Sequence, residues 1–169
     1  IGTPTAPPNQ VLVGLALFLT FFIMAPTFKT VYDDAIKPLS KNEITSEEAY
    51  DVGIKPIRQF MLEQTNSKDI RMFIDIAKVD TSTLKDYDDI PIQVLIPSFI
   101  VSELRIAFII GFLIYIPFII IDMVVSSALM SMGMMMLPPT TISLPFKILL
   151  FIMADGWNLV IGNLVKTFY

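Results

Sequence analysis

The chain of 169 residues contains no cysteine and no histidine. Without cysteine, neither a disulfide scaffold nor a thiolate metal site can form. Without histidine, the chain lacks the commonest general base of enzymes and the commonest metal ligand of proteins. Both absences argue against catalysis and metal binding before any motif is considered.

Charge is also missing from long parts of the chain. Residues 1–28 carry none and residues 106–169 only four charges, whereas residues 29–105 carry 10 Lys/Arg and 14 Asp/Glu. Hydrophobic residues make up 54% of the sequence, more than in ordinary soluble domains. No Lys/Arg cluster offers the basic surface that nucleic acid requires. The charges therefore predict a first apolar helix (1–28), a polar helical domain (29–105) and an apolar helical hairpin (106–169).

The first apolar segment, residues 11–28, is close to the length of about 20 residues that a membrane-spanning helix needs. Asn9 is the predicted N-cap, and Pro26 is expected to kink or end the helix. A fully buried core helix is the alternative interpretation.

The second apolar segment, residues 106–137, holds a single charge, Asp122. Its polar residues fall at helical spacing, which is typical of a face that packs on another helix or lines a water-filled path. They are Asp122, Ser126, Ser127 and Ser131. Two prolines at 138 and 139 then break the helix, and residues 142–165 predict another long helix. The order predicts an αα-hairpin.

The polar segment also shows helix signals. Thr45 and Glu48 have the spacing of a capping box, and the helix that they start is expected to be limited or kinked at Pro56. Residues 68–79 predict a second helix from apolar positions at i, i+3, i+4 and i+7. Pro97 is expected in the first turn of the next helix. We predict an all-α, membrane-type fold of helical hairpins with a small polar helical domain.

The sequence shows no constellation for catalysis. Adjacent carboxylates occur at three places, but neighbouring acids point apart on a helix and usually face solvent. No nucleophile is paired with a base. We therefore predict no enzyme activity, no cofactor and no metal.

Five of the ten methionines lie within seven residues, at Met130, Met132, Met134, Met135 and Met136. Helical amphipathicity does not require three adjacent methionines, because they point in different directions. Methionine is long, unbranched and adaptable. A ring of such side chains from several subunits would seal a pore and still give way to a polypeptide that passes through it. The alternative interpretation is a flexible hairpin tip that packs into a neighbouring protein or lipid.

Four charged residues interrupt or border the apolar hairpin: Glu103, Asp122, Lys147 and Asp155. One lysine among three acids suggests an ion pair that holds helices together. The alternatives are solvation of Glu103 and proton relay by Asp122 or Asp155.

Several motifs resemble the FliP family. They are residues 7–12 (PPNQVL), 14–24 (GLALFLTFFIM), 102–104 (SEL), 111–112 (GF), 116–118 (IPF), 121–125 (IDMVV), 130–139 (MSMGMMMLPP) and 143–147 (SLPFK). The similarity covers essentially the whole chain, and the polar segment contributes least to it.

FliP proteins form the flagellar export gate, with relatives among the R-type export proteins of virulence injectisomes. The resemblance implies a core subunit of the type III protein export apparatus in the bacterial inner membrane, needed for flagellum assembly. It implies a homo-pentamer, joined by Q-type and R-type gate subunits into a helical channel for unfolded substrates, with the polar domain on the extracytosolic side. Family members also carry a signal peptide and an earlier hydrophobic segment, so we expect this chain to be truncated at its start.

The resemblance also implies roles for particular residues. Met134, Met135 and Met136 correspond to a methionine gasket that closes the pore. Glu103 and Lys147 correspond to a charge pair between neighbouring gate subunits. Apart from the resemblance, a transporter subunit for small solutes or ions, with a site around Asp122 or Asp155, and a membrane scaffold remain alternatives.

Overall fold

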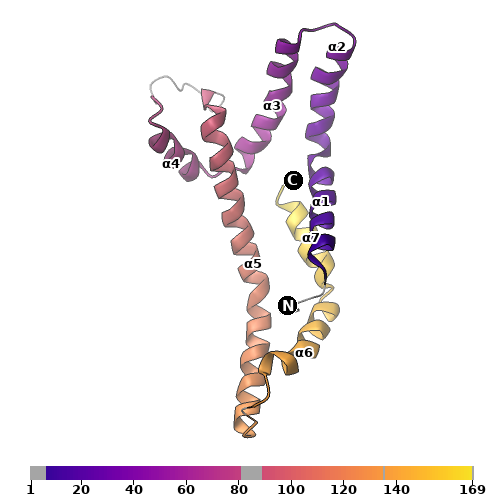
Figure 1. Ribbon diagram of the computed structural model, residues 1–169, viewed down its shortest axis with the longest axis vertical. Coiled ribbons are helices and arrows are strands. Elements are labelled where there is room, and N and C mark those ends of the chain that lie inside the picture. The colour runs from indigo at the N-terminus through magenta and orange to yellow at the C-terminus, as the bar shows by residue number, and fades with distance from the viewer. Residues whose placement is uncertain (1–6, 81–88, 135, 169) are drawn as a thin grey trace. The chain divides into compact units, whose positions relative to one another are not determined.

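The computed structural model describes residues 7–80, 89–134 and 136–168 (Figure 1). Within these residues the chain is helical and contains no strand, which confirms the predicted all-α class. In chain order the elements are α1 (Asn9–Val31), the π-helical turn η1 (Tyr32–Ile36), α2 (Lys37–Ser40), α3 (Ser46–Gln64), α4 (Ser67–Ala77), α5 (Ile92–Ser131), α6 (Pro139–Met153) and α7 (Gly156–Lys166).

The chain divides into two compact units. One comprises residues 1–20 and 108–169, and the other comprises residues 21–107. Helices α1 and α5 each contribute to both units, so the helices cross the segment boundaries that the charge distribution predicts. The first unit holds α6, α7 and the part of α5 from residue 108 on, and the polar helices α3 and α4 lie in the second.

Two helical segments are long and apolar enough to cross a membrane. An 18-residue window within Asn9–Ser40 has a mean hydropathy of 2.3, and one within α5 has a mean hydropathy of 2.6. Helices α6 and α7 pass the same test only as a pair bent by 59°, which makes a third candidate span among the described residues. At about 1.5 Å per residue, α5 is about 60 Å long, twice the thickness of a bilayer core. Only part of α5 therefore needs to lie in hydrocarbon.

Two helices continue past prolines at which the sequence predicts a kink or a stop. Helix α1 continues past Pro26 and α3 continues past Pro56. Helix α5 begins directly after Pro91, so Pro97 lies in its second turn and not in its first. A proline removes one helical hydrogen bond, but the bonds on either side of it persist when the rest of the helix is well packed or strongly apolar.

The helix starts follow local capping chemistry. The predicted capping box is confirmed, because Glu48 N–H donates to the Thr45 hydroxyl and Thr45 N–H donates to the Glu48 carboxylate at 2.8 Å. These hydrogen bonds lower the pKa of Glu48. At the start of α1, the amides of Val11 and Leu12 donate to the Pro8 carbonyl. Asn9, the predicted N-cap, is therefore the first helical residue, and the helix begins one position earlier than the sequence predicts.

The unit of residues 21–107 has a small apolar core. The core joins the end of α3 to α4 and to the first turns of α5. Its buried members are Met61, Ile70, Ile74, Ile90, Val94 and Leu95. The predicted helix at residues 68–79 is confirmed as α4, whose apolar face supplies two of them.

The prediction of one helix over residues 142–165 is wrong. Asp155 adopts a left-handed backbone with φ of 49°, and the chain restarts as α7 in a new direction. A Cβ on Gly156 would lie 2.3 Å from the ring of Phe151, so this position admits only glycine without rearrangement. The ring of Trp157 meets Phe151 edge to face at 5.5 Å. The bend thus depends on packing between residues on both sides of it.

Candidate functional site: the methionine turn and the hairpin that carries it

The methionine-rich turn begins at a defined helix end. Gly133 has φ of +74°, a conformation that costs glycine little. The Met134 amide donates to the Leu129 carbonyl at 3.0 Å, and the Gly133 amide donates to the Met130 carbonyl at 3.1 Å. These two hydrogen bonds make a Schellman motif, which ends α5 and turns the chain away from the helix axis.

The turn exposes its methionine side chains. In the isolated chain Met132 is 62%, Met134 48% and Met136 98% exposed, and Met135 lies outside the described residues. Exposed apolar side chains in a continuous run are typical of a surface that another molecule covers. The structure therefore brings at least two members of the predicted triplet together on one exposed turn between α5 and α6.

A polar cluster joins α5 to α6 below this turn. The Lys147 ammonium lies 2.6 Å from an Asp122 carboxylate oxygen. The Ser143 hydroxyl donates to the other Asp122 oxygen. Ser143 and Lys147 stand at i and i+4, so they share one face of α6. We name Asp122, Ser143 and Lys147 the hairpin cluster.

The hairpin cluster is almost closed to solvent. Ser143 is 0% and Lys147 3% exposed, while the Asp122 side chain keeps 25% of its surface. A buried ammonium without a partner is strongly unfavourable, because it loses its hydration without compensation. The pair with Asp122 therefore fixes α5 and α6 relative to each other, and these two helices flank the methionine turn.

The other two charged candidates lie elsewhere. Glu103 is partly buried in α5 and belongs to the unit of residues 21–107. Asp155 is exposed at the bend, where its carboxylate accepts a hydrogen bond from the Asn158 amide at 3.0 Å. The pair between Glu103 and Lys147 of neighbouring subunits stays a prediction, since one chain cannot test it.

A second buried polar cluster, which the sequence does not predict, lies between α4 and α5. Asp69 on α4 is 2% exposed and accepts hydrogen bonds from Ser102 and Arg105 of α5, both at 2.6 Å. The Asn66 amide donates to the Ser102 hydroxyl at 2.8 Å. The sequence does contain a signal for the burial of Asp69, because this residue falls within the apolar arc of an amphipathic helix. Its partners lie over 30 residues away in the chain, so no local pattern identifies them.

The Asp69 cluster predicts an acid-sensitive contact. The hydrogen bond from Ser102, and then Arg105, hold the pKa of Asp69 below its ordinary value of 3.8. A lowered carboxyl pKa contributes stability above the unfolded-state value, and this contribution is lost as pH falls through the folded-state value. We expect Asp69→Asn to unfold at a lower temperature than wild type at neutral pH. We expect that difference to shrink below about pH 4, measured by circular dichroism of the full chain in detergent.

The matched control is Asp75→Asn on the exposed face of the same helix. It should leave both the stability and its pH dependence close to wild type, since exposed substitutions usually have small effects. Equal acid sensitivity of wild type and Asp69→Asn would contradict the role assigned to Asp69.

Among the described residues, no group of three or more acids could hold a metal ion. The carboxylates of Asp69, which is buried, and Asp122, which is partly buried, accept hydrogen bonds from serine hydroxyls and from basic side chains. The arrangement is suited to fixing helices relative to one another and to presenting an apolar turn.

Comparison with known proteins agrees with these features. A family model described as the FliP family matches residues 1–164. Proteins named flagellar biosynthetic protein FliP are 52% identical in Pectobacterium carotovorum subsp. carotovorum, 54% in Buchnera aphidicola subsp. Acyrthosiphon pisum and 55% in Bacillus subtilis. These alignments cover 99% to 100% of this chain, and 65%, 44% and 75% of the three relatives.

The chain thus spans less than two thirds of the first two relatives. The family match extends through both compact units and includes the methionine turn and the hairpin cluster. Over this length and at these identities, the relationship does not depend on one motif. The chain belongs to the FliP family.

Proposed function

We propose that this protein is a pore subunit of the flagellar type III protein export gate in the bacterial inner membrane. In this proposal it serves as a conduit for unfolded export substrates and not as an enzyme. Five copies assemble with Q-type and R-type subunits around the passage. The polar domain, residues 29–105, lies on the extracytosolic side.

The observation that carries the proposal is the exposed methionine turn at the end of an apolar hairpin. An isolated copy leaves Met136 98% exposed, which is unfavourable in water. Around a shared axis, turns from several copies would cover one another and close the passage. Because methionine re-packs easily, the same contacts would yield to an unfolded chain and close again behind it.

In the isolated chain Lys147 is 3% exposed, so the proposed charge pair between copies requires a local opening of the hairpin cluster. A lysine ammonium has three N–H donors, of which Asp122 uses one. In the assembled gate, Glu103 of a neighbouring copy would approach Lys147 and use another. The lysine would then couple the fold of each hairpin to the contact between copies.

The transporter alternative fits the geometry less well. Such a site needs an acid that binds a solute or carries a proton at mid-helix. Both oxygens of Asp122 already accept hydrogen bonds, from Ser143 and from Lys147. The scaffold alternative gives no reason for exposed methionines in the turn.

The test is the mass of the assembly. Co-expression with Q-type and R-type subunits, purification in detergent and native mass spectrometry should give a complex with five copies of this chain. A complex with another copy number would contradict the pentamer. A chain that stays monomeric and soluble without detergent or partners would contradict the proposal as a whole.

A further inference from the structure

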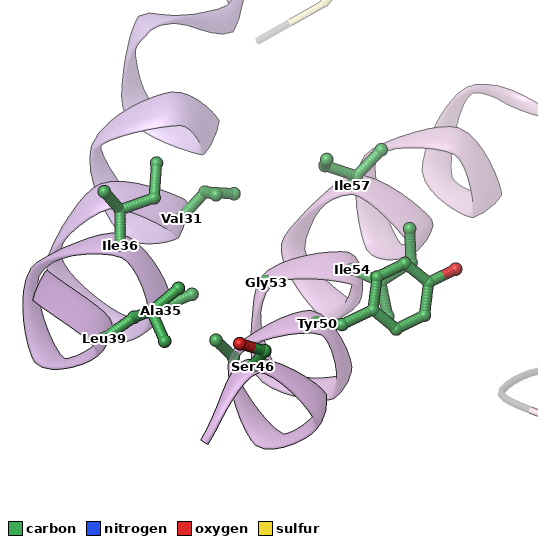
Figure 2. Close-up of a pocket in the computed structure, with 10 residues that line it drawn as sticks. Val31, Ala35, Ile36, Leu39, Ser46, Tyr50, Gly53, Ile54 and Ile57 are labelled. Carbon is green, nitrogen blue, oxygen red and sulfur yellow. The ribbon is translucent and has the colours of Figure 1, made fainter. Parts of the chain in front are cut away.

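An apolar groove runs between η1–α2 and the first half of α3 (Figure 2). We name it the η1–α3 groove. Its floor is made by small buried residues, Ala35, Ala49 and Gly53, where a Cβ on Gly53 would lie 3.2 Å from Ala35. Its walls carry larger side chains that stay exposed, among them Tyr50 at 66% and Leu39 at 37%. The close approach of the helices thus leaves a shallow apolar surface in the polar part of the chain.

The groove lies in strongly acidic surroundings. Residues 32–51, which include most of its lining, hold six acids and two lysines. Asp33, Glu47 and Asp51 are exposed, and among the described residues none of them forms a salt bridge. An occupant of this groove should therefore combine apolar side chains with positive charge. An anionic membrane surface would be repelled.

Helix α4 has such a surface. Its inner face packs in the core, and its outer face exposes Met72 at 41% and Ile76 at 66%, one turn apart. Lys68, Arg71 and Lys78 are exposed around them, against a single exposed acid, Asp75. Among the described ion pairs, none involves these basic residues. We name this surface the α4 face.

The two surfaces match in length as well as in charge. Helix α4 has 11 residues and is about 16 Å long, at about 1.5 Å per residue. The α3 wall of the groove extends from Ser46 to Ile57, about the same distance. An amphipathic helix that lies in an apolar groove with anchors at i and i+4 is a common mode of protein recognition.

We propose that the α4 face of one copy docks in the η1–α3 groove of the next copy. The inference rests on the proposed function, which requires several copies around one axis, and it names the surfaces that join them. The two surfaces are different parts of the same chain, so the contact is heterologous, from head to tail. Repetition of a heterologous contact closes a ring when the rotation allows it.

Cysteine cross-linking tests the pairing directly, because these 169 residues contain no cysteine. Two differently tagged full-length forms, Tyr50→Cys and Ile76→Cys, are co-expressed and treated with a short bis-maleimide. We expect a cross-linked product that carries both tags, and a ladder of larger products when both substitutions are in one chain. Neither single variant should cross-link to itself, since a heterologous contact never brings identical positions together.

The matched control moves the first cysteine to the opposite face of α3. Lys55→Cys is exposed there, in a different surface depression, and should give no product with Ile76→Cys. Charge reversal supplies a second measurement. Lys68→Glu with Arg71→Glu should lower the cross-linking yield about fivefold, and Glu47→Lys with Asp51→Lys in the neighbouring copy should restore it.

The outcomes separate this inference from the proposed function. One outcome is that native mass spectrometry finds the oligomer while Tyr50→Cys and Ile76→Cys give no cross-linked product that carries both tags. In that case the docking of the α4 face in the η1–α3 groove is wrong, and the proposed function as a gate subunit is unaffected. A dimer from Tyr50→Cys alone would show a contact between identical surfaces and would also overturn the pairing. If no oligomer forms with the partner subunits, the proposed function fails first.

Discussion

Replacement of Met134, Met135 and Met136 together by alanine is expected to leave the assembly intact and to make the membrane leaky. Methionine side chains are at most weak hydrogen-bond acceptors, and Met134 and Met136 are exposed, so the fold should tolerate the substitutions. Alanine removes most of the volume that would close the passage. Hydrophobic constrictions block ions by excluding water, so widening one should raise permeability by on the order of tenfold.

The measurement is dye or ion release from vesicles that contain the purified complex, or sensitivity of cells to small polar toxins. Met130→Ala with Met132→Ala is the matched control, because both methionines are exposed next to the triplet but before Gly133. This control should leak little. Leucine at the three positions keeps the volume, so it should seal the resting pore while adapting less well to substrates.

A tight pore in the triple alanine variant would contradict the gasket, provided that native mass spectrometry finds the same copy number as in wild type. Leakage from the control pair equal to that of the triplet would also contradict it. That result would show a general loosening of the hairpin end.

Loss of one partner in the hairpin cluster is expected to have the largest effect on stability. Asp122→Leu strands the Lys147 ammonium, which is 3% exposed. Removal of one member of a buried ion pair typically costs about 3–5 kcal/mol, because the remaining charge stays without compensation. We expect a large fall in the unfolding temperature in detergent and a loss of protein export.

The double variant Asp122→Leu with Lys147→Met supplies the decisive comparison. Apolar replacement of both partners is often close to neutral, so the double variant should recover much of the lost stability. Asp155→Asn is the matched control in the same unit, and its exposed position predicts a change below about 0.5 kcal/mol. If the double variant is as unstable as Asp122→Leu, the stranded charge of Lys147 is not the cause of the lost stability. Lys147 would then stabilise the fold through contacts other than its pair with Asp122.

Export in the double variant tests the role of Lys147 between copies. If stability returns but export does not, the lysine also acts outside its own hairpin, as the predicted contact with Glu103 requires. If both return, the contact between copies does not depend on this charge.

The sequence identified the features that follow from local chemistry. Charge-free stretches of sufficient length can bury themselves only in lipid or against other chains, so the all-α membrane class followed directly. The capping box at Thr45 and Glu48 and the helix at α4 also depend on neighbours within a few residues. The paired prolines predicted a break after the methionines, and α5 ends seven residues before the first of them, at Ser131.

Prolines do not end α1 or α3, because the local cost of one proline is small beside a long run of helical hydrogen bonds. Pro26 and Pro56 each remove one bond, yet their helices continue for five or more residues. The break at Asp155 has the opposite character. Aspartate can adopt the left-handed backbone found there, but nothing local requires it. The close packing of the Phe151 ring against Gly156 is what fixes the position of the bend.

By itself, the sequence determined the helical class, the apolar segments, the methionine turn and the short list of charges that had to find partners. Only the tertiary structure decided which partners they found. Asp122 lies nine residues before the end of α5 and Lys147 eight residues after the start of α6, so they meet only because the hairpin folds back at that turn. Asp69 and Arg105 meet because α4 packs on α5. Pairing across such separations depends on the path of the backbone in space, and no local pattern of residues records that path.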